Sequence, residues 1–167
     1  MDIASALAGG DRRSIGRANE VASFVLAHAE HLPDLIDGLG HADPVIRMRC
    51  ADAAEKVAAA ESDWFVPFAG TLVAIAGTTT QQEVRWHLAQ ILPRLPLSPA
   101  ERAAAVSVLF RYLDDDSRIV RVCAMTALWT LSGTDPGLRR KVTSRVRRFA
   151  EAGSPAERSR ARKLLRG

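Results

Sequence analysis

The stretch SRIVRVCAMTALWTL, residues 117–131, has the pattern of one amphipathic helix. Counted from Arg121, apolar residues stand at offsets +3, +4, +6, +7 and +10, namely Ala124, Met125, Ala127, Leu128 and Leu131. Offsets of three and four place side chains on the same side of a helix, so these residues form one wide apolar face. The stretch therefore predicts a helix that buries this face against other parts of the chain.

The same pattern recurs at three further arginines. The offsets give Leu88, Ala89, Ile91, Leu92 and Leu95 from Arg85; Cys50, Ala51, Ala53, Ala54 and Val57 from Arg47; and Ala161, Leu164 and Leu165 from Arg158, with Arg162 interrupting. Successive arginines are 38, 36 and 37 residues apart, a period typical of helical repeats that stack on one another. We therefore predict an all-α fold, a right-handed α-α superhelix (solenoid) of about four to five helical pairs, with residues 1–167 as a single domain.

Helix-start signals divide the chain into helices and predict no strand. Asp43, Ser98, Asp135 and Ser154 are each followed by proline, the combination of an N-cap residue with proline at the first helical position. Ser98 and Ser154 also have glutamate three residues later, which completes a capping box. The expected helices cover residues 11–29, 32–39, 44–60, 63–76, 81–95, 99–113, 117–131, 136–152 and the segment from 155 onward; residues 1–10 are expected to be disordered or a short helix.

A turn aspartate, a β-branched residue, an arginine and an alanine-rich face recur within the period, as in Asp43…Ile46-Arg47…Ala51, Val84-Arg85…Ala89 and Asp116…Val120-Arg121…Ala124. This combination resembles the HEAT repeat family, over roughly residues 11–167. The resemblance implies that the arginine-marked helices line the concave side. It also implies that Asp43 and Asp116 pair with Arg47 and Arg121, so that Arg47, Arg85, Arg121 and Arg158 form a structural ladder. Ligand binding by this row is the alternative interpretation.

Offsets +1, +5 and +8 from each arginine lie on a face opposite much of the apolar set. In the central helices this face includes Trp86, Gln90, Thr126 and Trp129. Exposed aromatic side chains are frequent contact residues, although tryptophan also fills grooves between helices. We interpret the face as the partner-binding surface of a non-enzymatic scaffold, with another protein as the partner. Remote alternatives are a HEAT-like DNA glycosylase, which the pair Asp52 and Trp86 resembles, and a bilin lyase with HEAT-like repeats.

Positive charge is concentrated in the last part of the chain. Residues 138–167 contain eleven arginines or lysines and two glutamates, a net charge of +9, whereas the other 137 residues carry −5. A terminal repeat needs a polar outer face to stay soluble, but it does not need a single sign of charge. We therefore predict an acidic ligand here: a nucleic-acid backbone, an acidic protein segment or the acidic half of a second copy. The candidate residues are Arg140, Lys141, Arg145, Arg148, Arg162 and Arg166.

The other reactive residue types form no catalytic or metal-binding motif in the sequence. Cys50 and Cys123 are 73 residues apart, about two repeats, and are expected to be buried thiols beyond disulfide reach. The four histidines lack metal-site spacing, and no phosphate-binding loop or nucleophile elbow occurs. We therefore expect no enzymatic activity, cofactor or metal. The chain has no signal-peptide pattern and no apolar stretch of membrane length, so we expect a cytoplasmic protein that is monomeric or weakly self-associating.

Overall fold

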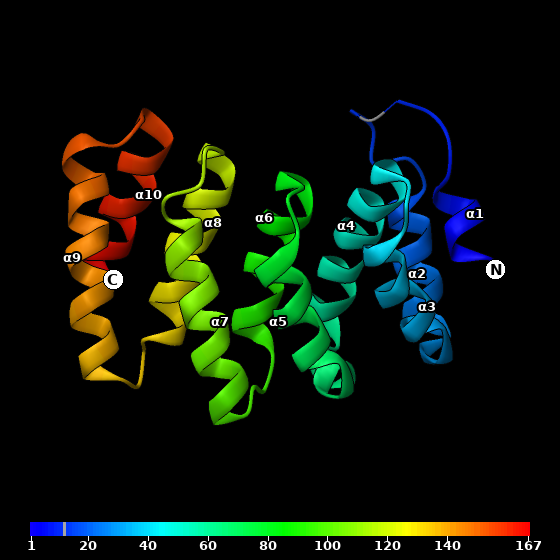
Figure 1. Ribbon diagram of the computed structural model, residues 1–167, viewed down its shortest axis with the longest axis horizontal. Helices are drawn as coiled ribbons and strands as arrows, with labels where there is room; N and C mark the ends of the chain where they lie inside the picture. Colours follow the sequence, from blue (N-terminus) through cyan, green and yellow to red (C-terminus); the bar gives the residue numbers. More distant parts are fainter. Residues whose placement is uncertain (12) are drawn as a thin grey trace.

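The computed structural model describes residues 1–11 and 13–167, and the regular elements in these residues are all helices (Figure 1). The α-helices are α1 (Ile3–Leu7), α2 (Ala18–Ala27), α3 (Leu32–Asp37), α4 (Pro44–Ala60), α5 (Ala69–Thr78), α6 (Gln82–Ile91), α7 (Pro99–Tyr112), α8 (Arg118–Leu131), α9 (Pro136–Ala152) and α10 (Pro155–Arg166). The 3-10 helices are η1 (Ala29–His31), η2 (Gly38–Gly40), η3 (Ser62–Phe68) and η4 (Leu92–Arg94). With no strand in the described residues, the all-α prediction is confirmed.

Alternate helices form a row along the long axis of the molecule. α2 contacts α4, α4 contacts α6, α6 contacts α8 and α8 contacts α10. The intervening helices α5, α7 and α9 each pack on a neighbouring helix of the row, and α5 also contacts α7. Figure 1 shows this side-by-side stacking, with the two termini at opposite ends. We call α2, α4, α6, α8 and α10 the row helices.

The apolar positions predicted from the arginine spacing form the core between the row helices. After Arg47, Arg85 and Arg121 they are all buried except Leu131, which is half-buried. Many of them are alanines, whose small side chains allow close contact between neighbouring elements. One close approach is at η2, where a Cβ atom added to Gly38 would lie 2.3 Å from the Cys50 Sγ atom. This contact requires glycine at position 38.

Side-chain caps fix the starts of most of the long helices. Asp43 Oδ1 accepts a hydrogen bond from the Val45 N–H at 2.8 Å, and Asp135 Oδ1 accepts one from the Leu138 N–H at 2.9 Å. The predicted capping boxes at Ser98 and Ser154 are both complete. The first N–H groups of a helix have no partner inside the helix, so these acceptors determine where α4, α7, α9 and α10 begin.

Two prolines shorten helices relative to the predicted ranges. α5 begins at Ala69, because the preceding residues, including Pro67, form η3. α6 ends at Ile91, and Pro93 lies in η4. Proline has no N–H donor for the α-helical ladder, and short 3-10 turns commonly occur at such helix ends.

The start of the chain differs from the prediction of a helix over residues 11–29. α2 is shorter, and Asp11, the expected N-cap, instead accepts a hydrogen bond from the Arg13 N–H at 2.9 Å in a turn. Gly16 has a φ angle of 53°, in the left-handed region that interrupts a right-handed helix. A Cβ atom there would lie 2.8 Å from the guanidinium carbon of Arg49 in α4. The helix therefore does not extend back to residue 11, because Gly16 is left-handed and packs against the buried Arg49 of α4.

Candidate interaction groove

A groove crosses three consecutive row helices on one face of the molecule. It encloses about 270 Å³ and is lined by residues of α6 and η4, of α8 and of α10. Gln90, Thr126 and Arg160 contribute polar groups to it. The buried side chains of Ala89 and Ala127 also line it, at positions where larger residues would fill the space. The groove is therefore a consequence of the alanine-rich pattern in the sequence.

The structure brings together two of the four predicted contact residues. Gln90 from α6 and Thr126 from α8 line the groove from neighbouring helices. Trp86 is half-buried one turn before Gln90 and does not line the groove. Its ring lies beside that of His87, with the two centroids 5.7 Å apart.

Trp129 lies outside the groove and packs against α9. The guanidinium carbon of Arg139 is 4.0 Å from the centroid of its ring, which is a cation–π contact. In a helix, residue 129 is rotated by about 60° from residue 126, whereas residue 130 stays within about 40°. Thr130 consequently lines the groove in place of Trp129. A spacing of four from Thr126 identifies Thr130, but no spacing rule singles out Arg160.

On α4, next to the groove, charged side chains neutralise one another. Asp52 pairs with Lys56 on the same helix, and Glu55 pairs with Arg94. His87 Nε2 lies 3.9 Å from Asp52 Oδ1. Burial lowers the pKa of His87, and the nearby Asp52 carboxylate only partly offsets this, so the imidazole is neutral at pH 7. The carboxylate of Asp52 is thus held by its ion pair with Lys56.

The four aligned arginines bind the turns that precede their helices. Each donates to a backbone carbonyl there: Arg47 to His41 at 2.7 Å, Arg85 to Thr79 at 2.8 Å, Arg121 to Asp116 at 3.1 Å and Arg158 to Gly153 at 2.6 Å. The first three also contact a side chain of the next period, respectively Gln81, Asp115 and Glu157. The partners differ from those implied by the resemblance: the Asp43 carboxylate caps α4, and Asp116 offers Arg121 its backbone oxygen. These contacts join successive periods, and none of the four arginines lines the groove.

The predicted anion-binding residues occupy different places on the last two helices. Arg145 is paired with Asp114, with Nη2 and Oδ1 2.6 Å apart. The other five, Arg140, Lys141, Arg148, Arg162 and Arg166, are exposed and have no hydrogen-bond or ion-pair partner within residues 1–11 and 13–167. Arg140 and Arg148 line a shallow hollow of about 470 Å³ on α9, together with Thr143 and Ser144. Unpaired positive charge is therefore spread over α9 and α10.

The thiols of Cys50 and Cys123 are not in their reactive, deprotonated form at neutral pH. Burial raises the pKa of the Cys50 thiol to about 12 and that of Cys123, in the wall of the groove, to about 11. Both are protonated at neutral pH, and the thiolate is the nucleophilic form. In the part of the chain that the structure describes, no group of three or more histidine, cysteine or carboxylate residues could hold a metal ion. None of the helices in that part combines the length and the apolar character needed to cross a membrane.

No protein-family model matches the chain, and no relative among curated proteins matches it. The description of the protein therefore rests on its structure alone. It is an all-helical protein whose row helices stack along one axis and carry a groove across three of them.

Proposed function

We propose that the chain is a non-enzymatic binding module that holds a segment of another protein in the groove across α6, α8 and α10. The observation that carries this proposal is the groove itself, which joins polar and apolar side chains from three consecutive row helices. We further propose that the stack is a right-handed superhelix of the HEAT type with the groove on its concave face, and that the protein acts in the cytoplasm. The regular arginine spacing and the contacts between periods support this architecture.

The groove suits an extended polypeptide that carries an acidic side chain. Thr126 Oγ1 donates to the Val122 carbonyl at 3.1 Å, so its lone pairs are free to accept a backbone N–H. Gln90 Nε2 donates to the Trp86 carbonyl at 3.3 Å, which leaves the amide oxygen as a second acceptor. Arg160 has no hydrogen-bond or ion-pair partner among the described residues, so it can bind a carboxylate.

Affinity purification from the native cell, with and without nuclease, tests the groove. A variant that combines Gln90→Ala, Thr126→Val and Arg160→Ala should lose the proteins that the wild type retains after nuclease treatment. A control variant that combines Ser107→Ala and Arg118→Ala, at exposed positions outside the groove, should retain them. Circular dichroism melting should be similar for all three proteins. Equal recovery with the groove variant would exclude the groove as the binding site.

A second candidate function, binding of a nucleic-acid backbone, follows from the exposed cations of α9. Arg140 and Arg147 lie two helical turns apart on α9 and line the same hollow as Thr143 and Ser144. Both arginines lack an ion-pair partner among the described residues. Arginines and hydroxyl groups are the side chains that most often contact phosphates in such complexes. An acidic protein segment, or the acidic part of a second copy of the chain, is the competing ligand.

Titration of labelled duplex and single-stranded DNA and RNA at two salt concentrations tests the second function. Binding should weaken steeply with salt, since each neutralised phosphate releases counterions. The double variant Arg140→Gln, Arg147→Gln should reduce the slope of log K against log salt by about 1.4–1.8, the loss of two phosphate contacts. Absence of binding at low salt would exclude nucleic acid as the ligand of α9.

A further inference from the structure

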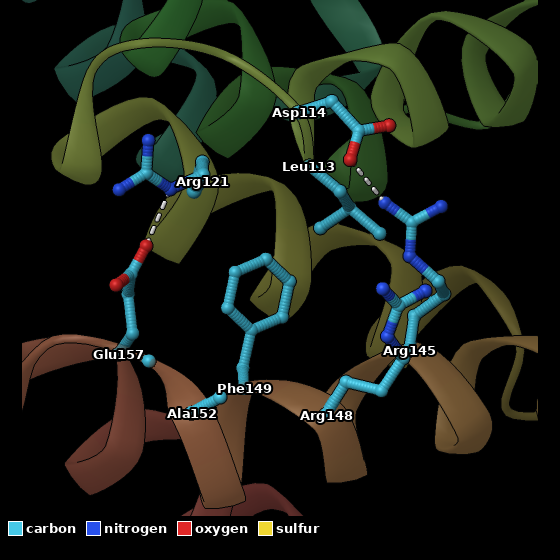
Figure 2. Close-up of a pocket in the computed structure, with 9 residues that line it drawn as sticks. Leu113, Asp114, Arg121, Arg145, Arg148, Phe149, Ala152 and Glu157 are labelled. Atoms are coloured by element: carbon cyan, nitrogen blue, oxygen red, sulfur yellow. Dashed lines mark hydrogen bonds and ion pairs between the residues drawn. The ribbon is translucent and has the colours of Figure 1, made fainter.

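A second cavity, separate from the groove, lies between the turn after α7 and the last two helices (Figure 2). We call it the turn pocket. It encloses about 320 Å³, at the lower end of the range of about 300–1,000 Å³ for small-molecule sites. Leu113, Phe149 and Ala152 form its apolar part, and Arg145 and Arg148 of α9 line one side. It shares no lining residue with the groove.

The arginines around the turn pocket differ in whether they have an ion-pair or hydrogen-bond partner. Arg145 Nη2 donates to Asp114 Oδ1 at 2.6 Å, but the Asp114 side chain is 71% exposed. Arg148 has no hydrogen-bond or ion-pair partner in the described residues. Arg121, on the opposite side, is already engaged by Glu157 and by carbonyls of its own turn. Figure 2 shows Arg145 and Arg148 on the same side of the turn pocket, with the Asp114 carboxylate bonded to Arg145. Of these two guanidinium groups, one is therefore paired with an exposed carboxylate and the other is unpaired.

We propose that the turn pocket binds an organic phosphate monoester, with the phosphate at Arg145 and Arg148 and the apolar stem against Phe149. A monoester carries a charge of about −1.5 to −2 at pH 7 and three acceptor oxygens. It can therefore satisfy two guanidinium forks, whereas a single carboxylate satisfies one. Asp114 occupies the position of the phosphate in the unliganded protein and competes with it. This site does not depend on the function proposed for the groove.

Phenyl phosphate is the first probe, titrated into the full chain by calorimetry and followed by amide chemical-shift changes. Asp114→Asn should raise its affinity about threefold to tenfold, because the competing carboxylate is removed. Arg148→Gln should lower the affinity about tenfold or more, as expected for the loss of a charged hydrogen bond. Inorganic phosphate should bind more weakly than phenyl phosphate, because it lacks the stem that contacts Phe149.

Two control variants distinguish binding in the turn pocket from general attraction of the phosphate to positive charge. Asp116→Asn removes the same charge from the same turn, and Lys163→Gln removes the same charge from the neighbouring helix α10, but neither residue lines the turn pocket. Each should leave the affinity within about twofold of the wild type. Equal effects of Asp114→Asn and Asp116→Asn, or of Arg148→Gln and Lys163→Gln, would overturn the proposal. So would a failure of phenyl phosphate to bind both the wild type and the Asp114→Asn variant.

A short peptide with one phosphotyrosine and no other charged side chain identifies the source of the phosphate. Tighter binding of this peptide than of phenyl phosphate assigns the turn pocket to a phosphorylated protein side chain. Equal or weaker binding assigns it to a free organic phosphate. Equal binding of the unphosphorylated peptide would overturn the proposal, because the phosphate would then contribute nothing.

Discussion

Arg49 is a buried cation, 3% exposed, that binds the start of the chain through backbone carbonyls, those of Leu7, Gly9, Asp11 and Ser14. A guanidinium group has five N–H donors in a fixed fork, so one side chain can satisfy several carbonyls at once. Hydrogen bonds to charged groups each contribute about 1.5–3 kcal/mol. The side chain therefore determines the path of residues 8–11 and 13–16, which lie outside the helices of the described chain.

Arg49→Met should lower the free energy of unfolding by about 2–4 kcal/mol, because it leaves buried carbonyls without donors. Limited proteolysis should then cut within residues 8–17 before it cuts elsewhere. Arg49→Lys should be intermediate, since an ammonium group has three donors and no planar fork. Arg118→Met, at an exposed position, should leave both properties unchanged. The same cleavage rate in the Arg49→Met and Arg118→Met variants would show that Arg49 does not hold this segment.

His87 should make stability depend on pH. Burial lowers its pKa below 6.5, while the carboxylates of Asp52, Glu55 and Glu83 raise it in part and Lys56 lowers it. As pH falls below about 6.5, the unfolded chain binds the proton before the folded chain does, so the free energy of unfolding decreases. The slope from this site is at most about 1.4 kcal/mol per pH unit, and it disappears below the pKa of the folded state.

Urea titrations between about pH 7.5 and pH 5 measure the pH effect of His87. The variant His87→Gln should show a smaller loss of stability over this interval than the wild type. The variant His28→Gln, at an exposed position, should show the wild-type loss. A wild-type pH dependence in the His87→Gln variant would assign the effect to other groups.

At the scale of helices and turns, local chemistry could be predicted and contacts over long sequence distances could not. The starts of α4, α7, α9 and α10 follow from an N-cap and a proline that are adjacent in sequence. The start of α2 depends on Arg49, which lies 33 residues after Gly16 and has no local signature. The partner of Arg121 is similarly distant: Glu157, rather than the turn aspartate, reaches it across one period.

Glu101 and Glu157 hold the same position in two capping boxes but differ in their surroundings. Glu157 is 3% exposed and also binds Arg121, whereas Glu101 is half-exposed and caps α7. Burial raises the pKa of Glu157, but the hydrogen bonds from Arg121 and Ser154 lower it by a larger amount. The pKa of Glu157 is therefore below the usual value for glutamate. Its contribution to stability is therefore present at neutral pH and decreases as pH falls through the normal range for glutamate.

Glu157→Ala should lower the free energy of unfolding by about 3 kcal/mol, because it leaves the partly buried Arg121 without its partner. Glu101→Ala should cause a clearly smaller loss, because only the cap of an exposed helix start is removed. Urea unfolding measures both, and a double-mutant cycle with Arg121→Gln measures the coupling between Arg121 and Glu157. Equal losses in the two alanine variants would show that the contact with Arg121 adds nothing to the cap.

At the scale of the whole molecule, the period predicts which helices carry the core but not how their other faces meet. Helical offsets placed Gln90 and Thr126 on one face, and the structure puts both in the groove. The same offsets misplaced Trp129, because residue 129 is rotated by about 60° from Thr126 and its ring contacts Arg139 of α9 instead. The turn pocket could not be predicted either. Arg145 and Asp114 are 31 residues apart and meet only when α9 stacks on the preceding turn.

The stack makes its end less critical for stability than its centre. Each row helix contacts the row helix before it and the one after it, so disruption of a terminal pair removes one interface along the row and disruption of a central pair removes two. Val146 in α9 and Leu88 in α6 are both fully buried. A carboxylate placed at either site is a buried, unpaired charge that costs several kcal/mol. Local opening of one part of a fold is common when few contacts join it to the rest.

Val146→Asp should therefore unfold the last two helices locally. In hydrogen–deuterium exchange, the amides of α9 and α10 should lose protection while those of α4 and α6 keep theirs. Leu88→Asp should remove protection throughout the row, because α6 has neighbours on both sides. Ser144→Asp, on the exposed side of α9, is the matched control and should leave the exchange pattern unchanged. If Val146→Asp removes protection as widely as Leu88→Asp does, the stack unfolds as one cooperative unit, and contacts between neighbouring helices do not by themselves determine its stability.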